Sequence, residues 1–102
     1  MSFGTKIRPY AVLSLSLAGA RADSAQGVIT LVGVSKATWK INTLTVITLG
    51  GGTLSVKLNS SSGDSITLSD GFKIEGILID ELYWTNSAQV GKTAEIFAAW
   101  AD

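Results

Sequence analysis

Hydrophobic and polar residues alternate along most of this 102-residue chain, and a period of two is the signature of β-strands. The clearest case is TLSVKL at 53–58, where Leu54, Val56 and Leu58 fall on one face and polar residues on the other. YAVLSLSL at 10–17 follows the same rule. The residues of its apolar face are Ala11, Leu13, Leu15 and Leu17.

Further strands are predicted wherever this alternation or a run of β-branched residues recurs. These segments are 27–34, 38–42, 43–49, 65–69, 72–84 and 93–100. Clusters of Gly, Asn, Asp and Ser separate them and predict turns. The turn segments are 49–53, 59–65 and 69–71. Residues 18–27, AGARADSAQG, form the longest stretch without a strand pattern, and we expect a loop there or a single helical turn.

The longest predicted strand segment contains one interruption. Phe72 and Ile74 share a face, and after Gly76 the alternation shifts so that Ile77 and Ile79 continue the apolar face. A glycine within a strand often marks a bulge that changes the register. We therefore expect a β-bulge at Gly76.

About eight short strands with no helical pattern between them predict an all-β fold. The expected architecture is a single compact antiparallel β-sandwich or barrel over residues 10–102. Residues 1–9, which end at the only proline, are expected to form an N-terminal arm.

The composition favours self-association. The chain is 46% hydrophobic and 16% charged, whereas soluble domains carry roughly 25% charged residues. A small domain with so little charge has apolar surface to cover, and another copy of itself is the usual cover. An unusually well-packed monomer is the alternative.

The residue types present exclude several function classes. The chain has no histidine and no cysteine, which removes the commonest general base and the soft ligands of transition metals. The net charge is zero without a basic run, so nucleic-acid binding is not expected. No apolar run reaches the roughly 20 residues that span a membrane. Asp80 and Glu81 are adjacent and point to opposite faces, so a catalytic carboxylate pair is not expected either. We expect no enzymatic activity, no metal and no cofactor.

The triplet Gly91-Lys92-Thr93 matches the end of a phosphate-binding P-loop. The motif needs another glycine five residues before Gly91, where this chain has Asn86. It also needs a following helix, whereas the residues after Thr93 alternate like a strand. We therefore expect a surface loop that binds no nucleotide.

Apolar residues near both ends of the chain are the candidates for an oligomer interface, because apolar ends are costly to leave in water. These candidates are Phe3, Ile7, Ile96, Phe97 and Trp100. For Trp100, a place in the monomer's own core is the competing interpretation. A carbohydrate-binding or adhesin-type module is the alternative function, and its candidate stacking residues are Trp39, Tyr83 and Trp84.

The second half of the chain carries a recognisable series of segments. They are the hairpin LSVKLN, the strand and turn ITLSDGFKIEG, and the closing stretch LYWTNSAQVGKTAEIFAAW. With this series, residues 43–100 resemble small virion structural proteins of tailed bacteriophages. The resemblance implies a jelly-roll-like β-sandwich without catalytic residues, which forms homo-oligomers on the virus particle. It further implies other virion proteins as partners, a head, decoration, neck or tail-associated position, and assembly in the host cytoplasm.

Overall fold

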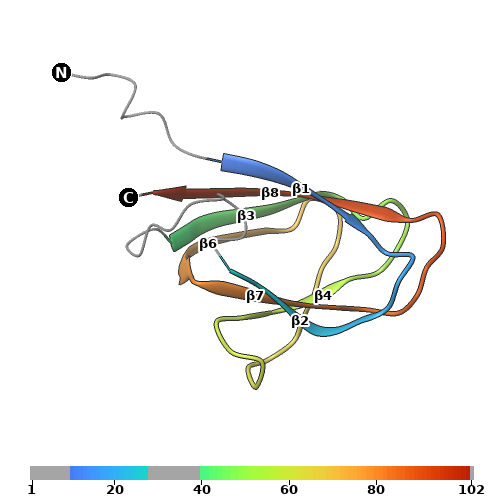
Figure 1. The fold of residues 1–102 in the computed structure, drawn as a ribbon. Coiled ribbons are helices and arrows are strands. Elements are labelled where there is room, and N and C mark those ends of the chain that lie inside the picture. The colour runs from blue at the N-terminus through green and yellow to red at the C-terminus, as the bar shows by residue number, and fades with distance from the viewer. Residues whose placement is uncertain (1–9, 28–39, 102) are drawn as a thin grey trace.

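The computed structural model describes residues 10–27 and 40–101, and within them eight strands form two antiparallel sheets that face each other (Figure 1). The expected all-β sandwich is confirmed. No helix in the described part of the chain is long and apolar enough to cross a membrane.

Each sheet contains four strands. The first, called sheet A here, has the order β1 (Tyr10–Ser16), β8 (Thr93–Ala101), β3 (Lys40–Thr48) and β6 (Lys73–Ile79). The second, sheet B, has the order β2 (Arg21–Gly27), β7 (Glu81–Asn86), β4 (Ser55–Leu58) and β5 (Ile66–Thr67). Except between β4 and β5, successive strands lie in opposite sheets. This order is that of a jelly roll, a sandwich built from two Greek keys.

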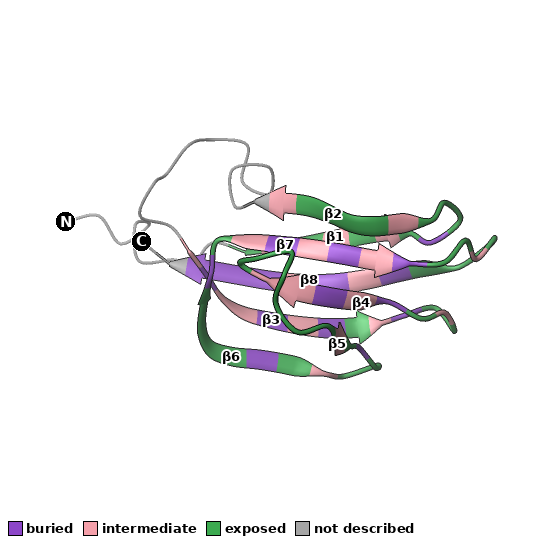
Figure 2. Ribbon diagram, turned by 90° about the horizontal axis from the view of Figure 1, so that it is seen from below, coloured by how far each residue is buried: buried purple, intermediate pink, exposed green. Residues whose placement is uncertain are grey.

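The core lies between the sheets and is formed by the inward half of the alternating pattern. Figure 2 shows buried and half-buried residues alternating along β7, where Leu82, Trp84 and Asn86 point inward. The largest side chains with almost no exposed surface are Trp84, Leu17, Ile41, Leu44, Leu54, Ile79, Leu82 and Ile96. Both sheets contribute to this set, so neither can bury its inner face without the other.

The predicted turns are present at 49–53 and 69–71. Gly50 has a φ of 63°, and a Cβ atom there would overlap the carbonyl oxygen of Thr93, so this position requires glycine. In the second turn Phe72 donates its N–H to the carbonyl of Ser69 at 3.0 Å. The Asp70 carboxylate ties the two turns together, since it accepts the N–H of Leu49 at 2.7 Å.

The prediction of a loop or helical turn at 18–27 was wrong, because Arg21–Gly27 forms strand β2. Its side chains are small or polar and carry no apolar alternation, so the strand is specified by its pairing with β7. The register shifts between Arg21 and Ser24, where Asp23 adopts a φ of 51° and donates its N–H to the Thr85 hydroxyl at 3.0 Å. Backbone pairing has overridden weak local propensity here.

The bulge at Gly76 is confirmed, but the residues around it lie differently from the prediction. Ile41 and Thr43 of β3 pair with Ile79 and Glu75, so β6 carries two additional residues in this interval. Gly76 has a φ of 80°. Ile79 is buried as expected, whereas Ile77 is 45% exposed, because the bulge turns it out of the sheet's alternation.

Two predicted strand boundaries also differ. The segment 72–84 is two strands in opposite sheets, since the chain crosses from sheet A to sheet B at Asp80. The segments 38–42 and 43–49 correspond to the single strand β3 over the residues described. The strand predicted at 27–34 and the arm at 1–9 lie outside the described residues, apart from Gly27, which ends β2.

Candidate interaction surface

The outer face of sheet A carries a patch of uncharged side chains. The strand register places Tyr10, Ala99 and Thr43 side by side in one row. The next row contains Val12, Phe97 and Thr45. We call these six residues the sheet A patch. Tyr10 is 63% exposed and Val12 is 50% exposed, although both are large and apolar for the most part.

Two aromatic rings organise the patch. The rings of Tyr10 and Phe97 stack with centroids 5.6 Å apart and planes inclined by 22°. Such stacking contributes roughly 0.5–1.5 kcal/mol beyond the area that it buries. The Tyr10 hydroxyl makes no hydrogen bond within residues 10–27 and 40–101. The patch therefore offers an exposed surface of mostly apolar side chains, two of which hold each other in place.

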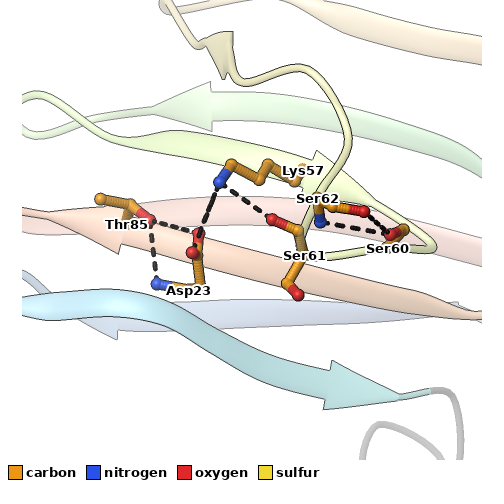
Figure 3. Close-up of polar contacts among 6 residues, drawn as sticks. All are labelled: Asp23, Lys57, Ser60, Ser61, Ser62 and Thr85. Carbon is orange, nitrogen blue, oxygen red and sulfur yellow. Dashed lines mark hydrogen bonds and ion pairs between the residues drawn. The ribbon is translucent and has the colours of Figure 1, made fainter.

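The outer face of sheet B is different because its polar groups bond one another (Figure 3). Lys57 forms an ion pair with Asp23 at 3.2 Å and donates to the carbonyl of Ser61 at 3.0 Å. The Thr85 hydroxyl donates to the Asp23 carboxylate at 3.2 Å. Three strands are thereby linked by side chains that remain in contact with water.

The same face of sheet B holds a titratable group, Tyr83, whose pKa is shifted. The Tyr83 hydroxyl donates a 2.5 Å hydrogen bond to the Glu81 carboxylate. This hydrogen bond is the main cause that raises the pKa of Tyr83 above its ordinary value of 10.0, with smaller contributions from burial and from the charge of Glu81. The pair shows that Tyr83, unlike Tyr10, has a polar partner within its own sheet.

A small hollow of about 220 Å³ lies between the edge strands β1 and β2. Leu15 and Trp84 contribute apolar surface to it, and Arg21 and Gln26 contribute polar groups. These polar groups are already engaged. Arg21 donates to the Ser16 carbonyl at 2.7 Å and to the Asn86 side chain at 2.9 Å, and the Trp84 indole N–H donates to Gln26 at 2.9 Å. Hydrogen bonds within the chain thus already engage Arg21 and the Gln26 side-chain oxygen.

The candidate interface residues divide between surface and core. Phe97 lies half-buried in the sheet A patch. Ile96 is fully buried between the sheets, so it belongs to the core of its own chain and not to a surface that another copy could contact. Trp100 is also buried, at 4% exposed, which agrees with the competing interpretation for this residue. Phe3 and Ile7 lie outside the described residues.

The candidate sugar-stacking residues do not form a shared platform. Trp84 is 2% exposed because its ring is part of the core, so a sugar could not stack on it without opening the sandwich. Tyr83 faces the opposite side of β7, half-buried, with its hydroxyl bonded to Glu81. Trp39 lies outside the described residues.

The Gly91-Lys92-Thr93 triplet lies in the turn between β7 and β8. Strand β8 begins at Thr93, where a P-loop has the first turn of a helix. Asn86, at the position of the missing glycine, is buried and donates its side-chain amide to the carbonyls of Gly19 and Ser87 at 3.0 and 2.7 Å. That no nucleotide binds here stays a prediction.

Several of the acidic residues within 10–27 and 40–101 have structural partners. Asp80 forms an ion pair with Lys40 at 2.7 Å, while its neighbour Glu81 accepts the Tyr83 hydroxyl. No group of three or more potential ligand residues within 10–27 and 40–101 is arranged to hold a metal ion. Asp70, as noted above, supports a turn.

Sequence reasoning missed Tyr10 and Val12, the two most exposed members of the sheet A patch. The signal was present in YAVLSLS, because the face opposite Ala11 and Leu13 begins with two large residues before it continues with Ser14. What the sequence could not supply is the pairing of β1 with β8, which brings Phe97 next to both of them.

Comparisons of this chain with protein-family models, with curated protein sequences and with solved structures found no match.

Proposed function

We propose that this protein is a non-enzymatic structural subunit that assembles with copies of itself through the outer side of sheet A, as a component of a bacteriophage particle. The observation that carries the proposal is the contrast between the two outer faces. Sheet B covers its outer face with bonded polar groups, whereas sheet A presents Tyr10, Val12 and Phe97. An exposed apolar patch on a small domain marks an interaction site.

Several features of the patch suit a protein partner and not a small ligand. It lies along the strands on the outer face of a sheet, whereas ligand sites are concave and contain converging polar groups. Its side chains are aromatic, aliphatic or threonine, and aromatic residues are enriched at the centre of protein interfaces. A second copy is favoured as the partner because the chain carries no net charge to repel itself.

The placement on a virus particle rests on the resemblance of residues 43–100 to virion proteins. Jelly rolls are used in viral capsids, although the same fold also serves lectins and cupins, so the fold alone does not decide the function. The genes beside this one should then encode portal, capsid or tail proteins. A neighbourhood without any virion gene would contradict the placement and leave self-assembly untouched.

Self-assembly is tested by sedimentation velocity of the intact chain over a range of concentrations. The expected result is a concentration-dependent mass that is a multiple of 10.6 kDa. Val12→Lys should weaken the association at least about tenfold, because a buried unpaired charge is costly at an interface. The matched control is Thr67→Lys, which places the same charge at an exposed position of β5 in sheet B. A constant mass of 10.6 kDa would refute the proposal.

A further inference from the structure

The four edge strands of the sandwich differ in how they are protected. An edge strand exposes unpaired N–H and C=O groups, and proteins normally protect such edges with charges, bulges or short strands. Strand β6 contains Lys73, Glu75 and the bulge at Gly76. Strand β5 is only two residues long. Strand β2 contains charged residues and a bulge next to Asp23.

Strand β1 has none of these protections within its own sequence, and a charged side chain, that of Arg21, reaches only its last residue, Ser16. Its seven residues, YAVLSLS, include no charge, no glycine and no proline. Its register with β8 runs without a shift from Tyr10 opposite Ala99 to Ser16 opposite Thr93. Among the described residues β8 is its only neighbour in the sheet. A long, regular and uncharged edge is suited to pairing with another strand.

The hydrogen bond of Leu17, which directly follows β1, shows which residues of this strand direct their backbone groups toward β8. Leu17 donates its N–H to the Lys92 carbonyl at 2.9 Å, so its backbone groups point toward β8. In an antiparallel pair successive residues point alternately toward and away from the neighbouring strand. The N–H and C=O groups of Val12 and Ser14 therefore point out of the sheet edge. The Ser16 carbonyl also points outward, in agreement with its hydrogen bond from Arg21.

We propose that β1 of one copy pairs antiparallel with β1 of a second copy, which joins the two A sheets into one continuous eight-stranded sheet. This inference rests on the proposed self-assembly and adds a contact at the edge of sheet A to the one through the sheet A patch. The register centred on Leu13 overlaps the whole strand. It places Val12 opposite Ser14 of the second copy. The backbone N–H and C=O groups of both residues point out of the strand edge, so they can form hydrogen bonds between the two strands.

The pairing is self-complementary in its side chains as well. In this register Ala11 of one copy lies opposite Leu15 of the other on the core side of the sheet. On the outer side, Tyr10 lies opposite Ser16 and Val12 lies opposite Ser14. The sheet A patches of both copies then lie on the same side of the joined sheet, where Ser14 and Glu95 of the second copy continue the row of Val12 and Phe97. Because the edges that remain are β6, β2 and β5, association through strand edges closes at two copies.

Replacement of Ser14 by proline is the decisive variant. Proline removes the outward N–H and is tolerated at an edge position whose N–H faces away from the sheet. Ser14→Ala is the matched control, since it keeps the N–H. We expect Ser14→Pro to weaken association at least about tenfold and Ser14→Ala to leave it near the wild-type value. Thermal unfolding of both variants at low concentration checks that the fold is retained.

Amide hydrogen exchange, measured by NMR on the wild-type protein, gives a readout that proline strain cannot affect. In the paired state the Val12 and Ser14 amides should exchange at least about tenfold more slowly than in dilute solution, while the Leu13 and Leu15 amides are protected at all concentrations. If the chain associates but the Val12 and Ser14 amides remain fast and Ser14→Pro associates normally, the strand pairing is wrong and self-assembly stands. If the chain never associates, both proposals fail.

Discussion

The two outer faces of this sandwich both belong to four-stranded antiparallel sheets, yet the side chains that they carry differ. On sheet B, Lys57, Asp23 and Thr85 bond one another across three strands. On sheet A, Tyr10 and Phe97 stack but offer no polar group to water beyond one hydroxyl. Alternation places half of every strand outward, and it does not dictate what the outward residues are. This difference is the basis of the proposal that sheet A, and not sheet B, contacts a second copy.

Adjacent residues of β8 should separate stability from assembly, and Ile96→Ala should have the largest effect. Ile96 is fully buried, so its truncation should lower the free energy of unfolding by about 2–5 kcal/mol. Phe97→Ala should cost less stability, since the ring lies on the outer face, and should instead weaken self-association. Urea denaturation and sedimentation of both variants test this. Equal loss of stability in the two variants would show that the sheet A patch is structural.

The ion pair on sheet B should matter little. Lys57→Met removes the contact with Asp23, but both side chains are partly exposed, and such pairs are worth less than about 1 kcal/mol. We expect a small loss of stability that diminishes further at high salt, and no change in association. Thermal unfolding at two salt concentrations measures the first effect. A change in sedimenting mass would mean that sheet B also takes part in assembly.

The titration of Tyr83 should give the smallest effect. Its pKa is raised by the Glu81 hydrogen bond, so the favourable contribution is complete below the ordinary value of 10.0 and is lost as the pH rises through the higher folded-state value. Absorbance titration of Tyr10→Phe, which retains Tyr83 as the only tyrosine, reports the pKa. Adding Glu81→Gln should lower the pKa toward 10.0. An unchanged titration would contradict the assigned cause.

The sequence was informative where short-range features decide the structure, namely the alternation of apolar residues and the backbone preferences of single residues. Leu54 and Val56 were predicted inward from alternation alone, and Gly76 and the turn at 69–71 were predicted from backbone chemistry. Strand β2 was missed because its small and polar residues carry no apolar alternation and depend on pairing with β7. The crossing at Asp80 was missed because alternation is the same in either sheet.

The candidate surface was predicted only in part, for a related reason. Phe97 was identified from its apolar neighbourhood, but the same neighbourhood also selected Ile96, which faces the core. Tyr10 and Val12 become part of a surface only through the register of β1 with β8, which joins residues more than eighty positions apart. Pairings of this kind cannot be read from periodicity.

The chain contains two tyrosines, one on each outer face, and they provide the most direct test of the central claim. Hydroxyl-radical footprinting with mass spectrometry measures the solvent exposure of Tyr10 and Tyr83 in the same sample over a range of concentrations. We predict that oxidation of Tyr10 falls as the protein associates, while oxidation of Tyr83 stays constant. Protection of Tyr83 with Tyr10 unchanged, or constant oxidation of both during association, would contradict an assembly through sheet A.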